Sequence, residues 1–279
     1  MRQYTRDDLT FDVIDRGPSD GEPIVLLHGW PATASQDDAV ATILVDEGSR
    51  ILAPDQRGYS ARARPHGRRA YVMAELVADV MALIDAADLD RVHLVGHDWG
   101  GAVAWALAGE HPERLSTMTV LSTPHPRAMQ RAMVSSTQLL HSMYAVFFQV
   151  PVLPEMLLLA RDGGVGRAVL GRSGLSTHRA SEYMARQMQP GMMTATLAWY
   201  RALPLRSGIR SDAEVSTPTL YVWSTGDAAL GRRAAELTGD CVVGPYRFEI
   251  LEGVSHWIPE EVPDKVAHLI LDHIAAHRP

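Results

Sequence analysis

Short, nearly continuous apolar runs alternate with amphipathic helical stretches along much of this chain, and the alternation limits the folds open to it. The runs at residues 23–29 (PIVLLHG), 50–58 (RILAPDQRG), 91–98 (RVHLVGHD) and 115–124 (LSTMTVLSTP) have the length and composition of buried strands. Strands that are apolar throughout occur mainly in parallel sheets covered by helices on both faces. We therefore predict an α/β fold with a mostly parallel sheet.

The strand pattern stops after residue 126 and resumes near residue 217. Residues 127–210 contain no clear buried strand and are rich in Met, Leu, Arg and Gly, which indicates several short helices. Two further strands are expected at 217–227 and 246–257, followed by a terminal helix at 263–277. We predict a core formed by residues 1–126 and 211–279, with residues 127–210 inserted as a helical cap.

Composition limits the binding partners and the cellular location to be expected of this chain. The formal charge of −7 gives no general attraction to nucleic acid or to an anionic membrane. Cys241 is the single cysteine, so no intrachain disulfide can form. No apolar run reaches the roughly 18 residues of a membrane span, and the first residues lack the apolar segment of a secretory signal. We expect a cytoplasmic protein without membrane insertion or nucleic-acid binding, and the oligomeric state stays undecided.

The most informative motif lies where the strand at 91–98 meets the helical stretch after it. Residues 96–100 read Gly-His-Asp-Trp-Gly, which resembles the nucleophile elbow Gly-x-Ser-x-Gly of α/β-hydrolases with Asp98 in place of serine. The glycines would give a tight turn room for close packing. The alternative is that Asp98 merely caps the following helix. The strand–turn–helix context, together with the acid and the base identified in the next paragraph, favours a role for Asp98 as a nucleophile.

A nucleophile of this kind needs a base and an acid that orients the base. His256 follows the last expected strand, where a loop can reach the elbow, so we predict it as the base. Asp227 ends the strand at 217–227 and completes the chain order nucleophile, acid, histidine; the alternative for Asp227 is an ordinary turn residue. The end of the strand at 115–124 offers no Asp or Glu.

Other histidines are expected to have structural or surface positions. His28 would support its own loop, and His97 would point away from the elbow. His268, His273 and His277 fall in the terminal helix and are expected at the surface. The basic run at residues 57–69 is expected to be a solvated loop.

An aspartate changes the bond that such a site attacks. A carboxylate is already ionised at neutral pH and can attack an sp³ carbon to form an alkyl-enzyme ester. The His256–Asp227 pair would then activate water against that ester. Backbone N–H groups of Trp99 and of Trp30, in the loop after the first of these strands, would form the oxyanion hole.

The ordered set of motifs resembles the epoxide hydrolases of the α/β-hydrolase superfamily. The matching segments are HGWP at 28–31, DQRGYS at 55–60, GHDWGG at 96–101, STPHP at 122–126, GD at 226–227 and EGVSHW at 252–257. The resemblance implies hydrolysis of an epoxide to a vicinal diol, with no cofactor and no metal. It also implies that Tyr144 and Tyr200 from the cap polarise the epoxide oxygen. Ala198 departs from the Asn that often stands there in the family.

Two other functions stay open at this stage. Haloalkane dehalogenases are similar and use the same triad, and Trp30 with Trp99 could hold a halide. The fold also serves as a ligand receptor or survives in inactive proteins, although an intact triad argues against that. Asp98 disfavours a serine-type esterase, and Trp99 replaces the Arg expected of fluoroacetate dehalogenases.

The expected substrate is small and apolar, with an electrophilic carbon. Each tyrosine has the alternative of being a packing residue of a cap helix. Methionines of the cap predict an adaptable apolar pocket, although ordinary packing is the simpler role for most of them. They are Met133, Met143, Met156, Met184, Met188, Met192 and Met193.

Overall fold

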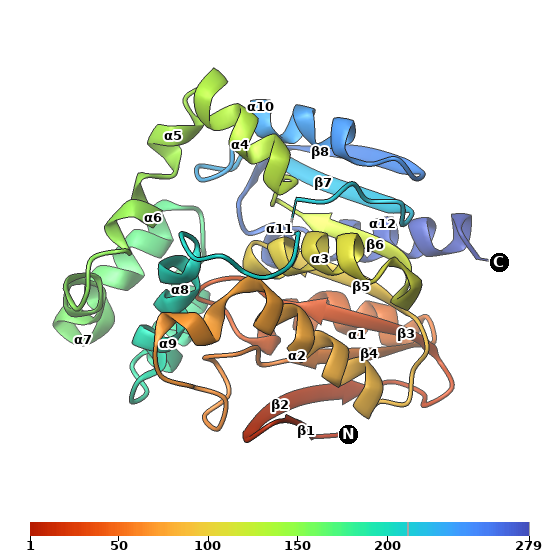
Figure 1. Ribbon diagram of the computed structural model, residues 1–279, viewed down its shortest axis with the longest axis horizontal. Helices are drawn as coiled ribbons and strands as arrows, with labels where there is room; N and C mark the ends of the chain where they lie inside the picture. The colour runs from red at the N-terminus through yellow and green to blue at the C-terminus, as the bar shows by residue number, and fades with distance from the viewer. Residues whose placement is uncertain (211, 279) are drawn as a thin grey trace.

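An eight-stranded, mostly parallel sheet forms the centre of the molecule in the computed structural model, which describes residues 1–210 and 212–278 (Figure 1). The strands are β1 (Gln3–Arg6), β2 (Leu9–Arg16), β3 (Glu22–Leu27), β4 (Ser49–Pro54), β5 (Val92–His97), β6 (Leu115–Leu121), β7 (Thr219–Gly226) and β8 (Tyr246–Ser255). Their order is β1-β2-β4-β3-β5-β6-β7-β8. Pairing is antiparallel at β1–β2 and β2–β4 and parallel elsewhere, which confirms the predicted fold class.

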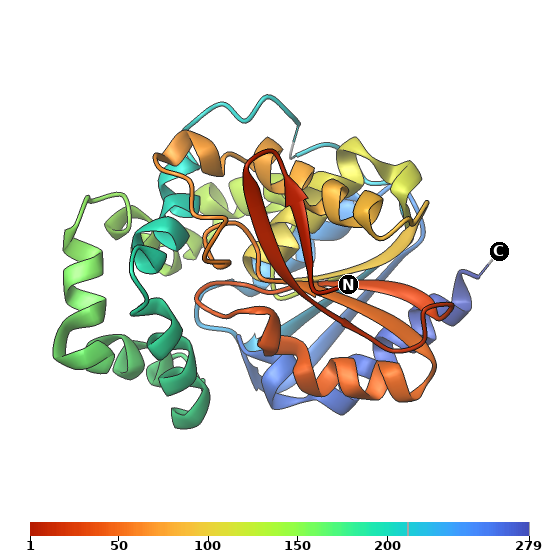
Figure 2. The same ribbon diagram turned by 90° about the horizontal axis from the view of Figure 1, so that it is seen from below.

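Helices cover both faces of the sheet, and each face has its own apolar cluster. Helices α2 (Met73–Ala86) and α3 (Trp99–Glu110) lie on one face, where the largest buried side chain is Trp105. Helices α1 (Asp38–Asp46), α11 (Ile258–Glu261) and α12 (Pro263–Ala276) lie on the other (Figure 2). Helix α10 (Arg232–Leu237) follows β7. The apolar runs read as strands are thus buried from both sides, as their sequence requires.

In the described residues between β6 and β7 there are six helices, and we call residues 127–210 the helical insertion. They are α4 (Pro126–Ser135), α5 (Gln138–His141), α6 (Met143–Phe147), α7 (Leu153–Arg172), α8 (Thr177–Gln187) and α9 (Met192–Ala202). Both views place them together at one end of the molecule, with α7 at the outer edge (Figures 1 and 2). That residues 127 and 210 are the boundaries of a separate cap domain remains a prediction.

Polar contacts attach α8 and α9 to the core. Arg186 on α8 forms an ion pair of 2.8 Å with Asp55, and the neighbouring Gln187 donates to the carbonyl oxygen of Pro31 over 3.0 Å. The indole of Trp199 on α9 donates to the carbonyl oxygen of Arg57 over 2.8 Å. These two helices therefore hold the insertion against the loops that follow β3 and β4.

Two expectations from the sequence are wrong in detail. The basic run at 57–69 is not simply a solvated loop, because Arg57 is buried and binds Asp79 of α2 through two hydrogen bonds of 2.7 and 2.6 Å. His273 is buried rather than exposed, because α12 packs on the sheet there and its Nε2 lies 3.2 Å from the carbonyl oxygen of Pro218. Among the described residues, no helix has the length and apolar character to cross a membrane.

Candidate active site

The turn between β5 and α3 holds Asp98 in a sharp, exceptional conformation. Its φ is 51°, and its side chain makes no capping hydrogen bond with α3, so helix capping does not explain it. A Cβ at Gly96 would lie 2.3 Å from the oxygen of Gly100, and one at Gly100 would lie 2.0 Å from that of Leu27. Only glycines allow β3, β5 and α3 to approach this closely, which accounts for the elbow.

The Asp98 carboxylate accepts a backbone hydrogen bond from the loop after β3. The N–H of Trp30 donates to Asp98 Oδ1 over 2.8 Å, and the N–H of Trp99, the first residue of α3, follows Asp98 directly in the chain. Burial raises the pKa of Asp98 above its ordinary value, while His256 and these two N–H groups act in the opposite direction. One of the two predicted oxyanion-hole donors, the N–H of Trp30, therefore already contacts the group on which a negative charge would develop.

His256 and Asp227 lie beside Asp98 in the arrangement expected of its base and orienting acid. His256 Nε2 is 3.7 Å from Asp98 Oδ2, and its Nδ1 is 2.9 Å from Asp227 Oδ2. The other oxygen of Asp227 accepts hydrogen bonds from the N–H groups of Ala229 and Leu230, at 2.8 and 2.9 Å. The loop after β7 thus fixes the acid, and the acid fixes the imidazole.

Charge couples the three side chains. Burial by itself would lower the pKa of His256, but its contacts with Asp227 and the charge of Asp98 outweigh burial and raise it to about 9. Burial acts to raise the pKa of Asp227, yet His256 and Ser122 bring it below its ordinary value. With its pKa at about 9, His256 is an imidazolium at neutral pH, and it lies between the carboxyl groups of Asp98 and Asp227.

Sequence reasoning missed Ser122, which belongs to this group. It follows β6, where the search for an acid found none, and its φ is 71°. Its hydroxyl donates to Asp227 Oδ2 and lies 2.9 Å from His256 Nδ1. A serine at the carboxyl end of a strand beside the elbow strand was the available signal, but a serine there also fits an ordinary turn.

A second buried network holds the loop that carries His256. His97 points away from the elbow, as expected, and its Nε2 lies 2.9 Å from the carbonyl oxygen of His256. Its Nδ1 lies 2.8 Å from Nε2 of Gln36, whose Oε1 accepts the N–H of Gly29 over 3.0 Å. Burial and the positive charge of His256 lower the pKa of His97 to about 3, so this ring is neutral. His28 supports its own loop through its Nδ1, which lies 3.0 Å from the carbonyl oxygen of Gly29, and its Nε2 accepts the N–H of Gln56 in the loop after β4 over 3.2 Å.

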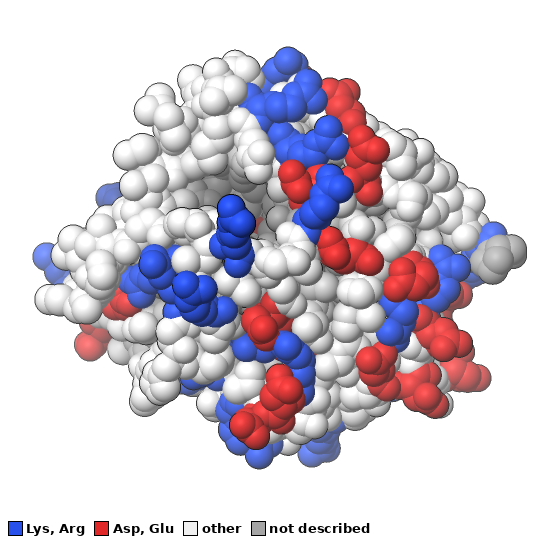
Figure 3. All heavy atoms as spheres, viewed as in Figure 1, with Lys and Arg blue, Asp and Glu red and all other residues white. Residues whose placement is uncertain are grey.

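A cavity of about 230 Å³ opens beside Asp98, and both predicted tyrosines line it. Tyr144 of α6 and Tyr200 of α9 have ring centroids 5.9 Å apart, and Trp99 packs edge-on against Tyr200 at 5.0 Å. Tyr200 is 4% exposed, whereas Tyr144 is 37% exposed. Figure 3 shows a hollow between the surface of α4 to α6 and the loop that follows α9. The insertion thus supplies one wall of the cavity and the elbow supplies another.

Most of the cap methionines have roles in packing or at the surface. Of those predicted, Met133 lines the cavity, together with Met129. Met184, Met192 and Met193 are buried in the packing of α8 and α9. Met143, Met156 and Met188 are exposed.

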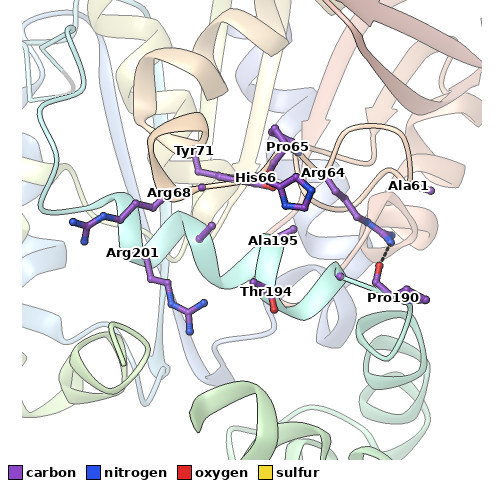
Figure 4. A pocket seen from close by; sticks show the side chains of 13 residues that line it. Ala61, Arg64, Pro65, His66, Arg68, Tyr71, Pro190, Thr194, Ala195 and Arg201 are labelled. Carbon is purple, nitrogen blue, oxygen red and sulfur yellow. Dashed lines mark hydrogen bonds between the residues drawn. The ribbon is translucent and has the colours of Figure 1, made fainter. Parts of the chain in front are cut away.

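A larger surface groove, of about 610 Å³, lies apart from the catalytic group (Figure 4). Its walls come from residues 61–71 and from the face of α9 that carries Thr194 and Arg201. Arg64 there donates to the carbonyl oxygens of Gly58 and Tyr59, and Arg201 binds Glu155 through two hydrogen bonds of 2.7 and 2.9 Å. These arginines bind groups of the protein itself, and Asp98, Asp227 and His256 do not line the groove.

Comparison with known proteins agrees with this fold. The family model described as the alpha/beta hydrolase fold matches residues 22–263, and the chain belongs to this family. The AB hydrolase superfamily protein YfhM of Bacillus subtilis is 36% identical over 272 residues, which cover 95% of this chain and 94% of that protein. Human Epoxide hydrolase 4 is 32% identical over 276 residues, which cover 94% of this chain and 75% of that protein.

A solved structure extends the likeness to three dimensions. Epoxide Hydrolase A from Mycobacterium thermoresistibile matches with a TM-score of 0.84 and 26% identity, over 99% of this chain and 98% of that one. The chain is thus an α/β-hydrolase-fold protein related to epoxide hydrolases.

Proposed function

We propose that this protein hydrolyses a small epoxide to a vicinal diol through a covalent ester on Asp98. The observation that carries the proposal is the convergence of one carboxylate and two phenols on the same cavity, opposite a buried histidine. Burial and then neighbouring negative charge raise the pKa of Tyr144, and burial does the same for Tyr200, so both phenols stay protonated. A protonated phenol can donate to an epoxide oxygen as the ring opens.

The geometry assigns separate tasks to the two oxygens of Asp98. Oδ1 is held by the N–H of Trp30, which leaves Oδ2 as the oxygen that attacks the epoxide carbon. The C–O bond of the epoxide breaks as the ester bond forms, and the departing alkoxide takes a proton from the tyrosine pair. The phenol is reprotonated from the surrounding water.

Formation of the ester also prepares the base for the second step. His256 is protonated at rest partly because Asp98 is ionised, so esterification of Asp98 lowers the pKa of the imidazole. The proton that His256 releases balances the one that the alkoxide takes up. Neutral His256 then accepts a proton from water, and the water oxygen attacks Cγ of Asp98. The oxyanion forms on Oδ1 against the N–H groups of Trp30 and Trp99, and its collapse breaks the ester C–O bond. The departing alcohol oxygen takes the proton of the new Asp98 carboxyl group, so that the diol leaves, Asp98 is again a carboxylate and His256 is again protonated.

Dehalogenation is the second candidate, and one observation favours it. The indole Nε1 of Trp30 is buried and has no hydrogen-bond partner in the described part of the chain. An indole N–H without a partner can donate to a halide, and Trp30 stands beside the catalytic carboxylate. The paired phenols favour an epoxide because an alkoxide, unlike a halide, needs a proton in order to leave.

The test is capture of the ester in the His256→Gln variant, which removes the base but leaves Asp98 free to attack. After incubation with a panel of epoxides and bromoalkanes, intact-protein mass spectrometry should show an adduct with the full mass of an epoxide. A bromoalkane would instead add its mass less that of HBr. The matched control, Asp98→Asn with His256→Gln, should show no adduct.

Isotope labelling of the unmodified enzyme gives an independent readout. A single turnover in ¹⁸O-water should leave the diol unlabelled and place the label in Asp98, because water attacks the ester carbonyl. Label in the diol of the first turnover would exclude the covalent route. Adducts from bromoalkanes alone would favour dehalogenation.

A further inference from the structure

The charge of the chain is divided unevenly between the helical insertion and the core. Residues 127–210 contain 10 arginines, no lysine and three acids (Glu155, Asp162 and Glu182), a net charge of +7. The whole chain has 26 basic and 33 acidic residues, so the remainder has 16 and 30, a net charge of −14. The overall charge of −7 therefore conceals a basic insertion on an acidic core.

The same insertion carries almost all of the exposed large apolar side chains. In the described residues, Val243 alone of this group lies outside the insertion. From Ala132 to Pro154 the sequence has 23 residues without Lys, Arg, Asp or Glu. Figure 3 shows the result as a white, uncharged surface over α4 to α6. We call the exposed aliphatic and methionine side chains of this stretch and of the first turns of α7 the apolar face. They are Val134, Leu139, Leu140, Met143, Val146, Val150, Val152, Leu153, Met156 and Leu157.

The α7 segment, in which two shorter helices meet at a kink at Ala160–Gly163, combines the two features at the outer edge of the molecule. Leu153, Met156 and Leu157 are exposed along its first half, and Arg161 and Arg172 are exposed further along. Within the described residues neither of these arginines has a carboxylate at ion-pair distance, whereas Arg201 and Arg186 are paired. Exposed apolar side chains next to cations without a carboxylate partner are also the features of helical segments that lie at a lipid–water interface.

We propose that the apolar face and the basic charge of α7 form a docking surface for an anionic lipid bilayer. Exposed apolar surface of this extent marks a binding site for another apolar surface. A second copy of the chain is a poor occupant because two insertions of like charge would face each other, even though Arg127, Arg131 and Arg186 are paired with carboxylates of the core. An anionic bilayer offers the complementary charge together with an apolar interior. This proposal does not depend on the reaction proposed above.

The position of this surface suggests what docking would achieve. Tyr144 and Ala145 line the catalytic cavity, and the flanking Met143 and Val146 belong to the apolar face. Docking would therefore place the mouth of the cavity next to the bilayer, where apolar molecules concentrate. The whole-chain charge excludes a general attraction to such a membrane, but its distribution permits a directional one.

Vesicle co-sedimentation of the full chain tests the proposal directly. We expect binding to vesicles of phosphatidylcholine with 30 mol% phosphatidylglycerol and a loss of binding with pure phosphatidylcholine or at high salt. Leu140→Ser with Met156→Ser, at sites 71% and 65% exposed, should weaken partitioning at least ~10-fold. Arg161→Gln with Arg172→Gln should do so by a similar factor, about 10-fold or more.

Matched control variants test whether vesicle binding depends on this surface or on any exposed apolar or basic side chain. Val243→Ser removes an apolar side chain that is 66% exposed on the core, and Arg68→Gln with Arg69→Gln removes two exposed core arginines. Both controls should bind like the unmodified protein, and thermal unfolding checks that every variant is folded. Absence of binding to anionic vesicles, or equal binding by all variants, would overturn the proposal. So would a dimer in light scattering that Leu140→Ser dissociates, because the face would then be occupied by a second copy.

Discussion

Two phenols and one carboxylate meet at the cavity, and the proposed reaction depends on how the two tyrosines are placed. Tyr200 is buried on α9, which is held to the core, whereas Tyr144 is partly exposed on the short helix α6. The two residues therefore differ in how firmly they are placed. The difference comes from the elements that carry them and not from the residue type.

Replacing both phenols separates the two candidate reactions. Tyr144→Phe with Tyr200→Phe should lower the rate of epoxide opening by about 100-fold or more, the contribution expected of general acid catalysis. Release of bromide from a bromoalkane should fall much less, because the halide leaves without a proton. Steady-state kinetics with one substrate of each class measures both effects. Equal losses in the two reactions would remove the role assigned to the tyrosines.

At the scale of elements, close approach of β3, β5 and α3 creates the elbow. The contact depends on the absence of a side chain at Gly96 and Gly100, where a Cβ would meet backbone oxygens. The position of Asp98 is therefore a property of three packed elements. A polar network joining His97, Gln36 and the carbonyl oxygen of His256 links this turn to the loop after β8.

Gly100→Ala should disturb the fold as well as the site. The new Cβ would lie 2.0 Å from the oxygen of Leu27, so α3 would have to move away from β3, at a cost of about 3 kcal/mol in the free energy of unfolding. Gly171→Ala in α7 is the matched control, since nothing lies within 4 Å of its Cβ, and it should be neutral or stabilise by about 0.5–1 kcal/mol. Urea unfolding of the two variants measures the contrast. A Gly100→Ala protein as stable as the original would show that the packing is looser than described.

At the scale of the whole molecule, buried titratable groups tie stability to pH. Burial raises the pKa of Asp37 to about 8 and that of Glu260 to about 7, and electrostatic contacts raise that of His256 to about 9 despite its burial. Each of these groups holds its proton more tightly in the folded state than in the unfolded state. The stability linked to each group is therefore lost as the pH rises from its unfolded pKa through its folded pKa.

The contribution of His256 can be isolated by comparison with His256→Gln. Its share of stability is fully present below its ordinary pKa of 6.5 and is lost as the pH approaches about 9. The free energy of unfolding of the original protein should therefore fall between these values by about 3 kcal/mol more than that of the variant. Urea unfolding at several pH values provides the measurement. Parallel curves for the two proteins would mean that His256 is not charged at rest.

The sequence alone determined the sheet, its helical insertion and the identity of the central residues. It could do so because strand burial, the glycines of the elbow and the chain order of Asp98, Asp227 and His256 are local signals at the ends of recognisable strands. The structure places these three side chains together. Their catalytic roles stay predictions until the ester is trapped.

Only the tertiary structure decided the rest, because it depends on contacts between distant segments. Ser122 joins Asp227 and His256 across 105 and 134 residues, and no local pattern distinguishes such a serine from a turn residue. Burial of His273 and Arg57 follows from the elements that pack on them, as does the opening of Tyr144 to the cavity. The apolar face also depends on the tertiary structure. Apolar residues in a sequence are expected in the core, and only the packing of the helices shows that these ones are exposed.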